Sequence, residues 1–230
     1  MGITLRSTTF NEPDSVSDVL KYEAGGYSRE VVTILSGSGA LGIGVVLGQI
    51  LVGAATAAAK AGGNTGNGTL TMDATTPVRP GAKVGVYTVR CIAAAANNGT
   101  FRITDPDGFV VGDVVMAAGA GAFDNDLKFA LADGASDFIV GDGFDITVAA
   151  GSKKWKPHTS GAVDGSEVAR AVLLHRVDAT SADQQAVVVM RHAEVSALGL
   201  KWHASVNNSD KKLAAHAQLA GFGIIVRQGA

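Results

Sequence analysis

The chain has 230 residues and a formal net charge of -2, a length that fits one large or two small domains. This charge is too close to neutral for a protein that coats nucleic acid. The single cysteine, Cys91, excludes an intrachain disulfide and a zinc site made of four thiolates. Glycine is abundant, at 30 residues, and aromatic residues are few, at 6%, which favours short strands and tight turns over long helices.

The N-terminal 26 residues are polar and lack the periodicity that would bury one face of a helix or strand. We therefore expect an extended N-terminal arm over residues 1–26, with Leu20 and Tyr22 as its large apolar anchors after Phe10. A disordered tail without a partner is the alternative. Near the start of the arm, threonine alternates with larger side chains, as in a strand that joins the sheet of another protein. These residues are Thr4, Leu5, Arg6, Thr8, Thr9 and Phe10.

Residues 31–59 contain no charged side chain, and this stretch is long enough to cross a bilayer. Six glycines interrupt it, however, and no cluster of lysine or arginine flanks it closely. Two buried strands joined by a Ser-Gly-Ser-Gly turn are therefore favoured over a transmembrane span. We expect these strands at 31–35 and 44–50.

The middle of the chain, residues 64–148, predicts a small β-sandwich. Residues 62–150 carry 5 basic and 10 acidic side chains, whereas residues 151–230 carry 10 basic and 6 acidic ones, which indicates a separate unit. Strong turn signals at 97–99 and 105–108 separate short runs of apolar residues. The expected strands are 68–72, 85–93, 99–104, 128–132 and 144–148.

The last third predicts further strands and one short helix. The continuous apolar run 186–190 is typical of a strand covered on both faces. Asn207-Asn208-Ser209-Asp210 predicts a turn and a helix N-cap, followed by a helix over 211–218 and a final strand at 224–226. Three large apolar side chains are expected in the core or in a trimer interface, namely Leu200, Trp202 and Phe222.

Several short motifs match reactive sites only superficially. Residues 37–42 fit the glycine pattern of dinucleotide sites, but a β-branched run follows where that pattern requires a helix. Asp164, Ser166 and His175 lack the tight turn that exposes a catalytic serine. We expect no enzyme activity, no cofactor and no metal. In particular, the acidic side chains that could suggest calcium are expected to be solvated turn residues, namely Asp133, Asp137, Asp142 and Asp145.

The segments on either side of the middle region resemble the lambda-type phage head decoration proteins. The resemblance rests on Asp164-Gly165 followed by an apolar run, on Leu200-Lys201-Trp202, and on the closing stretch Ala220-Gly221-Phe222-Gly223-Ile224-Ile225-Val226. Residues 27–31 and 42–48 are similar to the corresponding part of the longer family members. The resemblance covers residues 27–60 and 149–230, about half of the chain. Residues 64–148 resemble the β-rich insert of larger decoration proteins.

This resemblance implies a mainly β fold: a compact, β-clip-like decoration domain with a short helix, formed by residues 27–63 and 149–230 and interrupted by the β-sandwich insert. It also implies a homotrimer that binds the major capsid protein at three-fold positions of the expanded head and stabilises the shell. The arm would then add a strand to the capsid protein. Such a protein is made in the host cytoplasm and resides on the outer surface of the virion, without binding nucleic acid or membrane.

A second function remains open for the insert. An outward-facing insert at 64–148 can recognise a glycan or protein of the host surface, and this role is compatible with decoration of the capsid.

Overall fold

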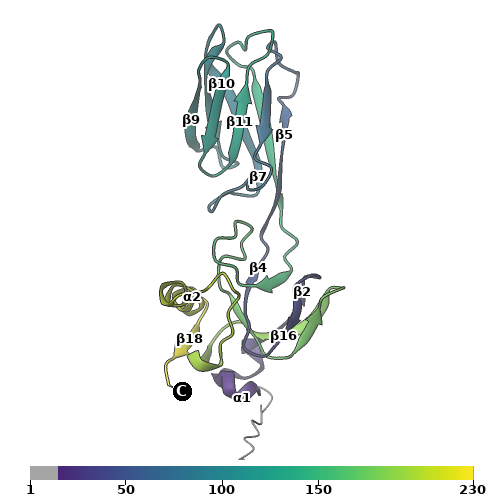
Figure 1. Ribbon diagram of the computed structural model, residues 1–230, viewed down its shortest axis with the longest axis vertical. Helices are drawn as coiled ribbons and strands as arrows, with labels where there is room; N and C mark the ends of the chain where they lie inside the picture. Colours follow the sequence, from purple (N-terminus) through teal and green to yellow (C-terminus); the bar gives the residue numbers. More distant parts are fainter. Residues whose placement is uncertain (1–14, 230) are drawn as a thin grey trace, which may run out of the picture. The chain divides into compact units, whose positions relative to one another are not determined.

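The computed structural model describes residues 15–229, which are mostly β-strand and form two compact units (Figure 1). Unit 1 contains the described residues up to Leu47, together with Ala169–His203 and the described residues from Asn207 onward. Unit 2 contains Gly48–Val168 and Ala204–Val206. The mainly β fold with one short helix is confirmed, and the domain boundaries expected at 63/64 and 148/149 stay a prediction.

Unit 2 is built on two antiparallel sheets, with strand orders β5-β12-β7-β8-β9 and β10-β11-β6 (Figure 1). The five strands expected in the middle region appear as β6, β7, β8, β11 and β12. The strands are β5 (Val52–Ala59), β6 (Thr69–Met72), β7 (Gly85–Ala95), β8 (Asn98–Thr104), β9 (Val110–Met116), β10 (Ala120–Asp124), β11 (Lys128–Ala132) and β12 (Gly143–Ala150), and β13 (Trp155–Pro157) follows in the same unit.

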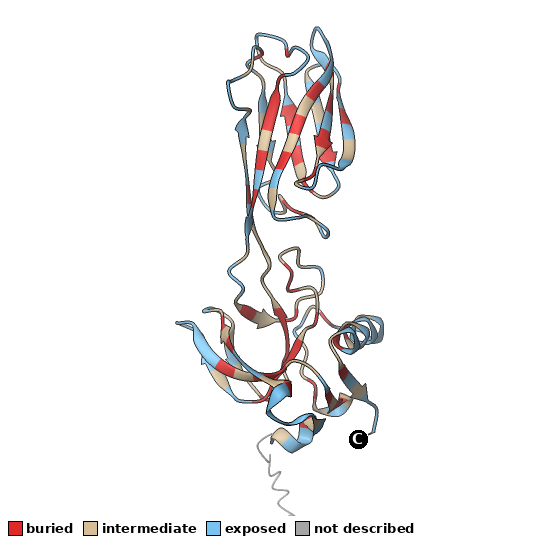
Figure 2. Ribbon diagram, turned by 180° about the vertical axis from the view of Figure 1, so that it is seen from behind, coloured by how far each residue is buried: buried red, intermediate tan, exposed pale blue. Residues whose placement is uncertain are grey.

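Alternation of apolar and polar residues along the strands forms the core of unit 2. Tyr87 and Val89 of β7 and Phe101 and Ile103 of β8 are fully buried, and the neighbours between them point to the other face. Figure 2 shows the resulting alternation of buried and exposed positions along these strands. The burial of each large side chain contributes about 1.5–3 kcal/mol, so the paired strands β7 and β8 anchor the sandwich.

The predicted turns of unit 2 are present and have clear local causes. Asn97 adopts a left-handed conformation, with φ of 53°, in the turn between β7 and β8. The buried carboxylate of Asp105 accepts hydrogen bonds from the backbone N–H groups of Asp107 and Phe109, which closes the turn after β8.

Unit 1 combines short strands with one helix. Strands β1, β17 and β18 form one sheet in that order, strands β2, β16, β14 and β4 are hydrogen-bonded in sequence, and β15 pairs with β3. The elements are α1 (Val16–Val19), β1 (Leu20–Glu23), the 3-10 turn η1 (Gly25–Ser28), β2 (Arg29–Ile34), β3 (Gly39–Leu41), β4 (Val46–Gln49), β14 (Ala171–Leu173), β15 (Val177–Ala179), β16 (Gln184–Val189), β17 (Ala193–Ser196), the 3-10 turn η2 (Ala197–Gly199), α2 (Ser209–Gly221) and β18 (Ile224–Arg227).

The only helix of unit 1 longer than one turn, among the described residues, is α2, and it begins where the sequence predicts. The side chain of Asn208 accepts a hydrogen bond from the backbone N–H of Lys211, which caps the first turn. Ala215 and Leu219 on one face of α2 are buried in the apolar core of this unit. The closing strand expected at 224–226 is β18.

The uncharged stretch 31–59 forms strands and not a helix. The two strands expected within it appear as β2 and β4, and β3 and β5 also lie in it. Within residues 15–229, none of the helices has both the length and the apolar character needed to span a membrane.

Candidate functional site

The segment that leads into unit 1 forms helix α1 and strand β1 from Val16 onward, whereas the sequence predicts an extended arm over residues 1–26. Val19 is 2% exposed and packs in the core of unit 1, with Val16 and Leu20 against the same cluster. Glycines at two facing positions permit this packing. A Cβ atom at Gly44 would overlap the backbone oxygen of Gly199, and one at Gly199 would lie 2.6 Å from the backbone oxygen of Asp18. Three apolar contacts thus hold a segment that is polar on average.

The sheet formed by β1, β17 and β18 presents one face to solvent directly beside this entry point. Tyr22 pairs with Glu194, and Glu194 pairs with Ile225, so these three side chains form a row across the strands. Tyr22 is 62% exposed and Ile225 is 38% exposed. The opposite face is buried through Ala193 and Ile224. We refer to the exposed face, defined by Tyr22, Glu194 and Ile225, as the β1 face.

A hollow of about 240 Å³ lies at one end of the β1 face. It is lined by Tyr22, Ala24, His192, Ala193, Glu194, Gly223 and Ile225.

A second exposed tyrosine flanks the hollow through His192. The ring of Tyr27 lies 5.5 Å from that of His192, and the guanidinium of Arg191 lies 4.9 Å from the Tyr27 ring centre. Arg191 also donates hydrogen bonds to the backbone oxygen of Tyr27 and to the carboxylate of Glu30. Tyr27 is therefore held by two neighbours although it is 61% exposed.

Backbone hydrogen bonds fix the shape of this region. His192 adopts a left-handed conformation, with φ of 46°, which is uncommon for a residue with a Cβ atom. Its backbone oxygen accepts from the N–H of Ala24 and from the hydroxyl of Ser28, and Ser28 is fully buried. Strained residues of this kind persist only where the surroundings determine them, so the wall of the hollow is preformed.

Each glutamate beside the β1 face is paired with an arginine. Two hydrogen bonds from Arg29, 2.7 and 2.6 Å long, hold the pKa of Glu23 below its ordinary value. A 2.7 Å hydrogen bond from Arg227 lowers the pKa of Glu194 in the same way. Both carboxylates therefore stay ionised through the neutral pH range, and the β1 face keeps these charges.

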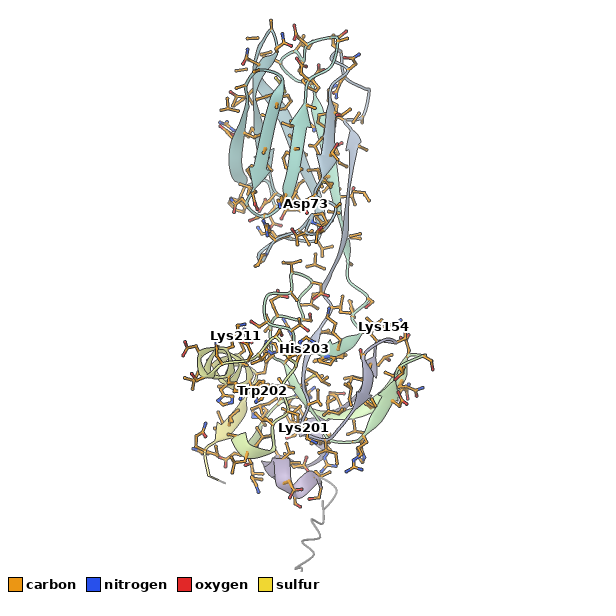
Figure 3. All side chains as sticks on the ribbon, viewed as in Figure 1. Asp73, Lys154, Lys201, Trp202, His203 and Lys211 are labelled. Atoms are coloured by element: carbon orange, nitrogen blue, oxygen red, sulfur yellow. The ribbon has the colours of Figure 1, made fainter. Side chains whose placement is uncertain are left out.

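The residues predicted as capsid-binding lie outside the described part of the chain: Thr4, Leu5, Arg6, Thr8, Thr9 and Phe10. The three residues predicted for the core or a trimer interface all lie in unit 1. Leu200 is buried in its core, and Trp202, which is labelled in Figure 3, packs partly buried on the same cluster. The ring of Trp202 lies 5.5 Å from that of His216 on α2. Phe222 follows α2 and lies under the guanidinium of Arg170, at 4.8 Å. A role of these residues in a trimer interface stays a prediction.

The motifs that resembled reactive sites have structural roles in the described residues. Ser166 is fully buried and donates its hydroxyl proton to Asp164, at 2.6 Å, so it is not an accessible nucleophile. The glycine pattern at 37–42 contains strand β3 and does not open a helix. Residues 15–229 contain no cluster of three or more metal-binding side chains of the kind formed by His, Cys, Asp and Glu.

The expectation that Asp142 is a solvated turn residue is wrong. Asp142 is 3% exposed, and its carboxylate accepts hydrogen bonds from the backbone N–H groups of Thr65, Gly66 and Ile139. Desolvation acts to raise its pKa, but these hydrogen bonds outweigh that effect, and the net pKa is lowered. No local pattern signals this role, because the donors Thr65 and Gly66 lie 77 and 76 positions away in the chain.

The fold and the β1 face define a β-rich structural protein that presents a preformed sheet face beside its N-terminal segment. The family model described as "Bacteriophage lambda head decoration protein D" matches residues 9–224, nearly the whole chain. The chain belongs to this family of phage head decoration proteins. The family is structural, and it identifies the chain as a capsid component of a bacteriophage virion.

Comparison with other known proteins adds no further assignment. No curated protein matches the sequence. Two crystal structures of Xanthomonas campestris FlgL, in space groups H3 and C2, each share 24% sequence identity with it and give a TM-score of 0.30. The matches cover 47% and 49% of this chain but only 34% and 33% of the two FlgL chains.

Proposed function

We propose that this chain is a cement protein that binds as a homotrimer at three-fold positions on the outer surface of the expanded head and stabilises the shell. The single observation that carries the proposal is the family match over residues 9–224. The major capsid protein is then the partner. Because the cement protein would bind the expanded shell and not its precursor, binding would shift the equilibrium between the two shells towards the expanded state by mass action.

In this proposal the N-terminal arm adds a strand to the major capsid protein through Thr4, Leu5, Arg6, Thr8, Thr9 and Phe10. Main-chain hydrogen bonds supply affinity in such strand addition. The packing of Val19 and the pairing of β1 with β17 support this role, because they attach the segment after the arm firmly to unit 1. Three arms in one trimer bind with high effective concentration, so modest contacts per arm add up to slow release.

Deletion of residues 2–14 tests the arm. This deletion leaves Val16 to Glu23 in place, whereas a longer deletion would remove Val19 from the core and unfold part of unit 1. We expect the truncated protein to melt at the same temperature as the full chain. Its apparent affinity for expanded empty heads should fall about 100-fold or more, because a trimer without its arms loses the avidity that three linked contacts provide. Binding of the truncated protein at full strength would contradict the arm mechanism.

A second candidate function, attachment of unit 2 to a host glycan or protein, is supported by the loop after β8. Asp105 and Lys83 form a 2.5 Å ion pair, and the Lys83 ammonium lies 5.6 Å from the ring centre of Phe109. Phe109 is 69% exposed on this braced turn, which is typical of an aromatic anchor in an interface. Full-length protein with Phe109→Ala should then bind host cells more weakly than the unmodified chain. Equal binding of both to cells would contradict this second function.

A further inference from the structure

We propose that the hollow at the end of the β1 face binds a lysine or arginine side chain of the major capsid protein. This inference rests on the proposed function, since it takes the capsid protein as the partner. It adds a second contact to that of the arm, in the folded part of unit 1, and it specifies the chemistry of the capsid residue that occupies it.

The charge of the hollow fits a basic side chain. Glu194 is the only acidic residue among the seven that line it, and none of the seven is lysine or arginine. Arg227 binds only one of the two carboxylate oxygens, Oε1, at 2.7 Å, and Arg227 is itself 55% exposed. The second oxygen has no hydrogen-bond partner among the described residues, so it can accept a hydrogen bond from a visiting ammonium or guanidinium group.

The apolar lining fits the remainder of such a side chain. Tyr22 lies directly across from Glu194, and its exposed ring can receive a cation on its face. Ile225 flanks Glu194 on the other side and can contact the methylene groups of a lysine or arginine stem. The row across three strands therefore offers an aromatic ring, a carboxylate and an aliphatic surface in the order that a long basic side chain requires.

The hollow needs little rearrangement before it binds. His192, which lines it, is fixed by the two hydrogen bonds to its backbone oxygen, and Ala193 donates its N–H to Gly223 on the neighbouring segment. Arg191, the nearest cation on this loop, is engaged by Glu30 and Tyr27 and does not line the hollow. A preformed site avoids part of the ordering cost of binding.

Four single variants of the full chain test the site through binding to expanded empty heads that lack the decoration protein. We expect Glu194→Gln and Tyr22→Ala to weaken binding about tenfold per variant, which corresponds to about 1.4 kcal/mol. Tyr22→Phe keeps the ring and should bind like the unmodified chain. Arg227→Gln removes the same ion pair as Glu194→Gln but leaves the carboxylate free, so its binding should be retained or strengthened.

Comparison of Glu194→Gln with Arg227→Gln separates a role of Glu194 in binding the capsid from a purely structural role of its ion pair. If Glu194→Gln and Arg227→Gln weaken binding equally, or if Glu194→Gln has no effect, the proposal is overturned. The affinity of Glu194→Gln should also fall less with added salt than that of the unmodified chain, because one ion pair with the capsid is missing. If the unmodified chain itself fails to bind the heads, the proposed function is wrong, and that result is distinct from failure of the hollow alone.

Discussion

At the scale of single residues, Asp142 shows how one carboxylate organises the end of the sandwich. Its three hydrogen bonds come from residues on two different loops, 65–66 and 139. A charged acceptor shared by one buried and two partly buried hydrogen bonds is costly to remove, because the donors then lose their partner with limited access to water. Asp142 therefore braces these two loops, together with the side chains of Asn64 and Asn67, which bond to Gly143 and Ser136.

Asp142→Ala should lower the free energy of unfolding by about 3 kcal/mol, since hydrogen bonds to charged groups contribute about 1.5–3 kcal/mol each. The contribution should also depend on pH. Because the folded pKa of Asp142 lies below its unfolded value, its stabilisation is complete above about pH 4 and is lost as the pH falls through the folded pKa. Urea denaturation at neutral pH and at about pH 3 measures both effects. The control Asp107→Asn, on an exposed ion pair, should change stability by less than about 1 kcal/mol.

His216 provides a second test of pH-dependent stability, in unit 1. Its Nε2 atom is buried without a hydrogen-bond partner, and desolvation, with a smaller effect of Lys212, lowers its pKa below 6.5. As the pH falls below about 6.5, the unfolded chain binds a proton at this position that the folded chain does not yet bind. The fold therefore loses stability as the pH falls from about 6.5 through the lowered pKa. His216→Phe keeps a ring beside Trp202 and should flatten the pH dependence of thermal unfolding in this range. An unchanged slope would contradict this assignment.

At the scale of elements, the register of strands creates features that no local pattern contains. Tyr22 and Glu194 are 172 positions apart in the chain, yet they are direct neighbours across β1 and β17. The sequence singles out Tyr22 as an apolar anchor, but the row with Glu194 and Ile225 follows from pairing alone. The candidate site was therefore not predictable from local patterns, although one of its residues was.

Local periodicity decides which elements can be predicted from the sequence. Strands with alternating large side chains, such as β7 and β8, have a clear local signal. Strand β5 has the sequence VGAATAAA, in which alanines carry almost no periodicity, and its conformation is set by pairing with β12. Helix α1 is likewise too short to be seen from sequence, and contact of Val19 with the core determines its position.

Two glycines with similar backbone angles test whether close packing holds α1 and η2 in place. Gly44 has φ of 88° and no room for a Cβ atom beside Gly199, whereas Gly39 has φ of 78° and nothing within 4 Å of that position. Gly39→Ala should cost about 1 kcal/mol, the penalty of the left-handed conformation alone. Gly44→Ala should cost about 3 kcal/mol or more, because the steric overlap is added. Equal melting temperatures of the two variants would contradict this difference.

At the scale of the whole molecule, the proposed clamp depends on assembly as much as on the fold of one chain. Light scattering should give a mass of three times 23.3 kDa for the purified protein if the trimer forms in solution. Added to expanded empty heads, the protein should raise the temperature at which the shells disrupt, since a ligand of one state stabilises that state. Precursor heads should show no such shift. A monomer that leaves expanded heads unaffected would contradict the proposed function.

The strand order β1-β17-β18 has a consequence for peptides or proteins genetically fused to this chain. Leu20, Val195 and Val226 lie in one row, β1 runs antiparallel to β17, and β18 runs parallel to it. The polypeptide therefore enters this sheet at Leu20 and leaves it beyond Arg227 at the same end. A bulky cargo joined after Arg227 would emerge at the end of the sheet where Leu20 enters, whereas the turn at 117–119 of unit 2 offers an insertion point on a different unit.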